Sequence, residues 1–211
     1  MLDRMNRVTE GKEIRERIQK ISKTKVRVAL MYQFITATRV SEVCGKYALT
    51  GKDFQTTSFE DHPVLLFTIL GKRGVFPRSV ALPLEEKYEP WSKEVLQYCL
   101  NQSVKDNKKD IFRLTPRSLQ MYCAEAFKGL SYFIESYGGV EGHSKRVLTH
   151  ALRHIRASEL MMKYGFDGID LAVYCGWSLT SMSSGMSKMA RRYVVGQWGR
   201  YFPKLIKPYK L

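Results

Sequence analysis

Cysteine is scarce and scattered in this chain. The four cysteines are Cys44, Cys99, Cys123 and Cys175, and no two of them form a C-x-x-C pair. This spacing argues against a zinc site and against a disulfide framework, and it fits a reducing compartment. The chain also lacks the clustered carboxylates that metal-dependent phosphodiester chemistry usually needs. We therefore expect four small core residues, no metal site and no cofactor.

Long apolar segments are missing as well. No run approaches the roughly 20 residues that a membrane-spanning helix requires, and no signal peptide precedes the first charged helix. Hydrophobic residues make up 44% of the 211 residues and aromatic residues 12%, as in folded globular proteins with one substantial core. The expected location is the cytoplasm.

Acidic residues are outnumbered, and they are absent from the end of the chain. There are 20 Asp and Glu against 35 Lys and Arg, a formal net charge of +15, and no acidic residue follows Asp170. Such a charge predicts salt-sensitive attraction to polyanions, with nucleic acid as the leading partner and an anionic membrane surface as the weaker alternative. The acid-free segment also carries aromatic residues, which is typical of a phosphate-facing or partner-docking surface. These are Trp198, Tyr201, Phe202 and Tyr209.

The hydrophobic pattern predicts a mainly α fold with one small antiparallel β-sheet (α+β). Residues 64–70 form the clearest strand, residues 71–74 have the composition of a turn, and residues 75–82 form the returning strand. A further strand with its turn is expected within residues 49–59. Helical spacing and helix-start signals such as Pro116 predict helices after a charged first helix within residues 1–22. These cover residues 25–36, 90–104, 116–136, 149–164, 168–175 and 179–196.

The stretch THALRHIRAS, residues 149–158, sets a histidine three residues before an arginine at the start of a predicted helix. At this spacing His150 and Arg153 share one helix face, so both can reach a single anion. In a chain of this charge the natural anion is a nucleic-acid phosphate. The plainer alternative is a histidine at a helix N-terminus followed by a solvent-facing arginine.

Two further candidates come earlier in the chain. Arg39, in TATRVSEVCG, precedes a short helix, and Glu42 three residues later can hold its guanidinium and aim it outward. An ordinary surface ion pair is the alternative. Lys72 lies at the tip of the predicted hairpin, although Gly-Lys-Arg-Gly loops are commonplace.

Two aromatic candidates follow. Trp177, at the end of a short apolar helix, has an indole N–H that can donate to an anion, although a buried tryptophan usually belongs to the core. Tyr193 lies in SSGMSKMARRYVV, in line with a stripe of methionines that indicates the packed side of its helix.

Taken in this order, the candidates resemble the catalytic domain of the tyrosine recombinase and integrase family. The resemblance runs from about Lys25 to about Val195. It is carried by TATRVSEV, the lysine in LGKRGVFPRSVALP, HALRHIRAS, the GW pair and the late tyrosine. It implies the catalytic-domain fold of that family, divided into an arm (1–22), the catalytic domain (23–196) and a basic tail (197–211). A virus or plasmid, an archaeal one included, is the kind of source that such an integrase implies.

The resemblance also implies a chemistry. The family cleaves and rejoins DNA without metal or ATP, through a covalent bond between a tyrosine and the 3′ phosphate of one strand. Arg39 and Arg153 would bind that phosphate, aided by His150 and the Trp177 indole, while Glu42 positions Arg39. Tyr193 would be the nucleophile.

In the same comparison, His150 would accept the tyrosine proton and Lys72 would protonate the leaving 5′ oxygen. The partner would be double-stranded DNA with a specific attachment site, which a tetramer of the protein would bind. The protein would be located with the host-cell DNA. The residues expected to contact DNA are Arg73, Lys145, Arg146, Arg156, Arg191 and Arg192.

The sequence departs from the family in two places. Tyr193 follows Trp177 by sixteen positions, about two helical turns later than usual in the family. Tyr201 and then Tyr209 are therefore the alternative nucleophiles, acting in cis or in trans, and the tail after Gly199 could dock on a neighbouring protomer. Residues 1–22 are too short for the family's N-terminal DNA-clamping domain, so a catalytic fragment of a longer integrase is an open alternative.

Two other functions compete with recombination. A type IB topoisomerase would use the same catalytic set to relax supercoiled DNA without a defined site. A DNA-binding module that lacks catalysis would bind a specific sequence and form no covalent adduct, and the displaced tyrosine keeps this alternative open.

Overall fold

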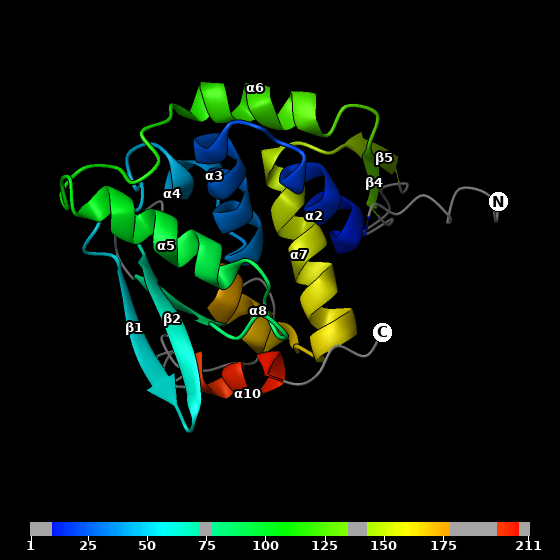
Figure 1. The fold of residues 1–211 in the computed structure, drawn as a ribbon. Coiled ribbons are helices and arrows are strands. Elements are labelled where there is room, and N and C mark those ends of the chain that lie inside the picture. The colour runs from blue at the N-terminus through cyan, green and yellow to red at the C-terminus, as the bar shows by residue number, and fades with distance from the viewer. Residues whose placement is uncertain (1–9, 72–76, 135–142, 178–197, 207–211) are drawn as a thin grey trace.

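The structure, a computed structural model, describes residues 10–71, 77–134, 143–177 and 198–206. Helices surround a central helix, α3 (Thr24–Ile35), and a three-stranded sheet lies along one side (Figure 1). Among the described residues, no helix is long and apolar enough to cross a membrane. All four cysteines are buried and free, as their scatter predicted.

The core is built around α3 and α7 (Thr149–Tyr164). α3 contacts α2 (Gly11–Gln19), α4 (Val40–Val43), α5 (Ser92–Ser103), α6 (Pro116–Ala126) and α7. Because neighbours cover it on nearly every side, α3 is apolar all round rather than amphipathic, and Val26 to Ile35 are buried except for Arg27. α7 begins and ends where the sequence predicted, and Gly165, at φ +64°, ends it in the left-handed conformation.

The sheet is antiparallel in the order β1 (Phe54–Phe59), β2 (His62–Ile69), β3 (Arg78–Pro83). β2 and β3 form the predicted hairpin, with Val64 opposite Pro83 and Ile69 opposite Arg78. β3 is buried almost throughout because α8 (Gly168–Cys175) and α10 (Phe202–Leu205) pack on it, whereas β1 lies at the exposed edge.

The predicted helix over residues 116–136 is wrong in its second half. α6 ends at Ala126, and Gly129 adopts φ +85°, which a helix does not contain. The chain then forms β4 (Ser131–Ile134), which pairs antiparallel with β5 (His143–Arg146) in a second, two-stranded sheet. A short apolar stretch such as SYFI fits either period, so the partner strand decided the outcome.

The two ends of the described chain pack into the core. On α2, Ile14 and Ile18 are fully buried. Near the C-terminus Trp198–Arg200 form a 3-10 turn, and Tyr201 and Phe202 are fully buried beside β3 and Phe59.

In the described part of the C-terminal segment, Tyr201 and Phe202 pack into the core of their own chain and do not form the phosphate-facing or partner-docking surface that the sequence indicated. Arg200 Nε lies 2.8 Å from Asp170 Oδ1, and Lys204 Nζ pairs with the other oxygen of the same carboxylate. Because this carboxylate is buried, both basic side chains neutralise an acid of their own chain. Tyr209 lies outside the described residues.

Candidate phosphate-binding site

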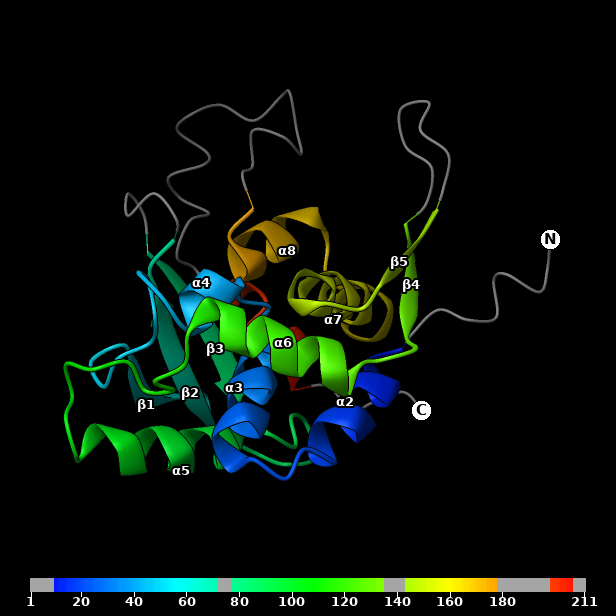
Figure 2. The same ribbon diagram turned by 90° about the horizontal axis from the view of Figure 1, so that it is seen from above.

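Four chain segments converge at the site: the turn between α3 and α4, the start of β3, the first two turns of α7, and the end of α8. Seen from above, α4 and α8 lie on one side of the molecule and α2 and α5 on the other (Figure 2). After α3 ends, the buried Ala37 adopts the left-handed conformation at φ +50°, which is strained for a residue with a Cβ. Arg39 is extended, at φ −77° and ψ 156°, and immediately precedes α4.

Glu42 fixes Arg39. The Arg39 backbone N–H donates to Oε2 of Glu42 at 2.9 Å, and Nη1 donates to Oε1 at 2.9 Å. The Glu42 side chain is fully buried while the Arg39 side chain is 34% exposed. Glu42 is therefore fixed in the core, and the Arg39 guanidinium remains accessible from solvent. The prediction that Glu42 holds the Arg39 guanidinium is confirmed by this contact.

A second arginine, Arg78, shares the same carboxylate. Its Nη2 donates to Oε2 of Glu42 at 3.1 Å, and its Nε donates to the carbonyl of Tyr174 at 3.0 Å. Burial alone would raise the pKa of Glu42. The charge and hydrogen bond of Arg78, with those of Arg39, outweigh burial and lower that pKa below its usual value.

Arg153 is held by backbone carbonyls. Nη1 donates to Ala37 at 2.8 Å, and Nη2 donates to Cys175. The residue is only 2% exposed, so the expected solvent-facing alternative is wrong. Burial, together with the charges of Arg78 and Arg39, lowers the pKa of Arg153 to about 10, which leaves the guanidinium charged at neutral pH.

His150 lies on the first turn of α7 with an exposed side chain. Its ring meets that of His154 edge-on at 4.7 Å between centroids, and His154 stacks on Tyr132 of β4 at 6.1 Å. Partial burial, followed by the charge of Arg153, lowers the pKa of His150, and Arg39 and Lys145 act in the same direction. The imidazole is therefore neutral at pH 7 and able to accept a proton.

Trp177 lies over Arg153, with the guanidinium carbon 5.8 Å from the ring centroid, a cation–π distance. Gly176, at φ +67°, ends α8 and turns the chain toward Trp177. The half-buried tryptophan is therefore part of the arginine's surroundings.

The structure thus brings together Arg39, Glu42, His150, Arg153 and Trp177 from segments far apart in the sequence. Arg78 is the member that the sequence analysis missed. The available signal was an arginine at the head of an apolar strand, RSVALP, directly after Pro77. The predictions for Lys72, Arg73, Tyr193, Arg191 and Arg192 concern positions outside the described residues.

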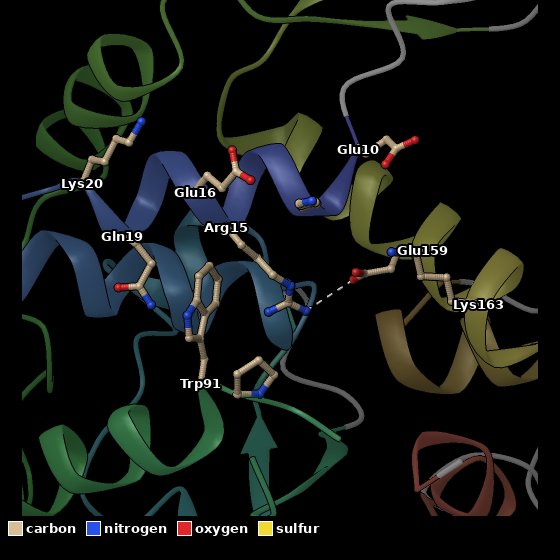
Figure 3. A pocket seen from close by; sticks show the side chains of 10 residues that line it. Glu10, Arg15, Glu16, Gln19, Lys20, Trp91, Glu159 and Lys163 are labelled. Atoms are coloured by element: carbon tan, nitrogen blue, oxygen red, sulfur yellow. Dashed lines mark hydrogen bonds and ion pairs between the residues drawn. The ribbon is translucent and has the colours of Figure 1, made fainter. Parts of the chain in front are cut away.

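The prediction that Arg156 contacts DNA is wrong. Arg156 is 1% exposed and pairs with Glu89 at 2.9 Å and with Glu159. The ion-pair network also includes Arg15 and borders a pocket lined by α2, Trp91 and the second half of α7 (Figure 3). Glu159 is nine residues from His150, about 13 Å along the helix, so the part of the network formed by Arg15 and Glu159 lies away from His150, although Arg156 is one helical turn from Arg153.

The structure also corrects the expectation that Tyr201 is an alternative nucleophile. Its hydroxyl accepts from the Ala81 N–H at 2.9 Å and donates to the Ser79 carbonyl at 3.3 Å, and the side chain is fully buried. Burial raises the pKa of Tyr201 well above its usual value.

Lys145 and Arg146 on β5 are exposed, as DNA contacts require.

Comparisons with known proteins find structures similar to this chain but no matching sequences. No family model matches the chain, and no curated protein matches it. The lambda integrase catalytic core matches with a TM-score of 0.52 and 16% identity, over 81% of this chain and 90% of that one.

A second solved structure, a lambda integrase tetramer bound to a Holliday junction, matches with a TM-score of 0.53 and 16% identity. The match covers 86% of this chain and 49% of that one, so the chain spans about half the length of the integrase in that assembly. The protein therefore has the fold of the lambda integrase catalytic core, the tyrosine recombinase catalytic-domain fold.

Proposed function

We propose that the protein is a site-specific DNA recombinase that cleaves and rejoins strands through a covalent 3′-phosphotyrosine, without metal or ATP. The observation that carries the proposal is the excess positive charge around one buried carboxylate. Three guanidinium groups, those of Arg39, Arg78 and Arg153, are gathered near Glu42, and a neutral histidine lies beside them. Such an arrangement is suited to a phosphate that gains negative charge in a transition state.

Arg39 and Arg153 each have donors left for that phosphate. Arg39 uses Nη1 on Glu42, which leaves Nη2 and Nε with no partner among the described residues. Arg153 uses one N–H of each terminal nitrogen on a carbonyl, and each terminal nitrogen carries a second N–H. The two guanidinium groups would bind the non-bridging oxygens, and Trp177 would add its indole N–H.

The remaining roles concern protons and the nucleophile. We assign Tyr193 as the nucleophile and His150 as the acceptor of its proton, since a tyrosine with a pKa near 10 needs an acceptor at neutral pH. Lys72 would protonate the 5′ oxygen that leaves. The phosphotyrosine ester conserves the bond energy, so the 5′ hydroxyl of another strand can reverse the step without ATP.

The proposed partner is double-stranded DNA with a specific attachment site, bound by a tetramer. The exposed Lys145 and Arg146 support DNA contact near the site. Arg73, Arg191 and Arg192 remain proposed DNA contacts, and the proposed place of action is the host-cell DNA. The solved lambda integrase tetramer on a Holliday junction supports the assembly proposed.

The test is a metal-free incubation with nicked suicide DNA that carries the attachment site, followed by a denaturing gel. We expect a covalent protein–DNA band that is lost in Tyr193→Phe and kept in the matched variant Tyr201→Phe. Tight binding without a band would favour the non-catalytic DNA-binding module. Relaxation of any supercoiled plasmid without a defined site would favour the topoisomerase.

A further inference from the structure

We infer that Arg78 is a positioning residue that holds the two phosphate-binding arginines in register with each other and with the β2–β3 hairpin. This inference rests on the function proposed above. Arg78 is buried, with its side chain 8% exposed, so it acts on the phosphate through other residues.

The first half of the evidence is its contact with Glu42. The carboxylate donates nothing and accepts from Arg39 at both oxygens, and Arg78 donates to Oε2 from the opposite segment, β3. Without Arg78, the fully buried carboxylate would keep Arg39 as its single described cationic partner, and its orientation would no longer be fixed from two sides.

The second half is its contact with the end of α8. Arg78 Nε donates to the Tyr174 carbonyl, and the next carbonyl along the chain, that of Cys175, accepts from Arg153. At Gly176 an added Cβ would lie 2.9 Å from Arg78 Cδ, so the chain passes directly against this side chain before Trp177. The Arg78 guanidinium therefore contacts both Glu42, which holds Arg39, and the end of α8, where the Cys175 carbonyl holds Arg153.

The place of Arg78 in the sheet adds the hairpin to this link. Arg78 is the first residue of β3 and pairs with Ile69, the last residue of β2. The segment between them carries Lys72, the proposed acid, six residues before Arg78. An arginine suits the position because its planar fork can donate in two directions at once, which a lysine ammonium does less rigidly.

The experiment measures the single-turnover rate of adduct formation at saturating DNA, with the Kd for the same DNA measured in parallel. Arg78→Met should slow adduct formation by about 100-fold, the scale expected for a misplacement of about 1 Å, and change Kd only a few-fold. Arg78→Lys keeps the charge and should lose less. Arg15→Met, which breaks a buried ion pair away from the site, should keep the wild-type rate among folded molecules.

A double-mutant cycle separates this role from a general loss of packing. If Arg78 acts through Glu42, then Arg78→Met combined with Glu42→Gln should be no slower than the slower single variant. Multiplied losses, or a wild-type rate in Arg78→Met, would overturn the inference. Melting curves of each variant establish that folded protein is compared.

A measurement that does not depend on DNA cleavage tests the positioning role of Arg78 independently of the proposed function. In ¹H–¹⁵N spectra of the arginine side chains, Arg78→Met should shift the Nε–H signals of Arg39 and Arg153, whereas Arg15→Met should not. If wild-type protein forms no adduct but these shifts appear, the recombinase function fails and the positioning role stands. If the signals are unchanged in Arg78→Met and Arg78→Lys, the positioning role fails.

Discussion

Gly176 lies so close to Arg78 that the glycine has no room for a side chain. A Cβ on Gly176 would meet Cδ of Arg78 at 2.9 Å and Nη1 at 3.1 Å. The glycine also adopts φ +67°, a conformation that residues with a Cβ rarely take.

Gly176→Ala should therefore impair both folding and cleavage. Backbone strain costs about 1–2 kcal/mol at a left-handed position, and the clash displaces Arg78 in addition. Gly165→Ala is the matched control, because Gly165 has φ +64° but nothing within 4 Å of an added Cβ. Melting temperatures and adduct rates should show a stability loss in both variants and a rate loss in Gly176→Ala alone. Equal adduct rates in the two would contradict the close-contact explanation.

The pH dependence of cleavage should report His150. Its pKa is lowered by partial burial and nearby cations, so the free protein holds a neutral imidazole above the usual value of about 6.5. A general base works when neutral; the rate at sub-saturating DNA should therefore fall as pH drops through the lowered pKa and be level from pH 7 to pH 8. His150→Gln should be slow and lack the acid limb. A rate that falls between pH 7 and pH 8 would argue against His150 as the acceptor.

Tyr201→Phe should destabilise the protein without abolishing the adduct. The change leaves the buried Ala81 N–H without its acceptor, which costs about 1–3 kcal/mol. Urea denaturation measures the loss, and the denaturing gel checks the adduct. Disappearance of the adduct from folded Tyr201→Phe would restore Tyr201 as the nucleophile.

The exposed basic residues of β5 should contribute to DNA binding through charge. Lys145→Gln should weaken binding and reduce the slope of log affinity against log salt by about 1, as for one lost phosphate contact. Lys93→Gln is the control, since Lys93 is exposed on α5, on the opposite side of the molecule, and pairs with Glu86. Identical salt slopes for the wild type and Lys145→Gln would remove Lys145 from the DNA contacts.

Acid should destabilise the site through Glu42. The pKa of this carboxyl is lowered in the folded state, so its stabilising contribution is present above the unfolded value of about 4.5 and is lost as pH falls through the folded value. Glu42→Gln should be less stable than the wild type at pH 7 and at pH 5, and this difference should shrink as pH falls from 4.5 to 3. Denaturant midpoints across that range check this, and a constant difference would contradict it.

The sequence by itself determined most of the local elements and the residue types that meet at the candidate site. Its period-2 and period-3.6 patterns specified the β2–β3 hairpin and the exact span of α7, because these signals lie within one element. The i, i+3 spacings placed Glu42 beside Arg39, and His150 and Arg153 on one face of α7. Motif order was enough to predict the catalytic-domain fold, although no sequence comparison matches.

Only the tertiary structure decided which charges face one another. Arg153 and Arg156 are three residues apart on α7 and have the same side chain, yet Arg153 donates to backbone carbonyls at the site whereas Arg156 pairs with Glu89 and Glu159. Arg78 joined the site because β3 brings it beside Glu42, thirty-six residues away. Burial, partners and the resulting pKa values depend on long-range packing, and packing of this kind leaves no local pattern for the sequence to display.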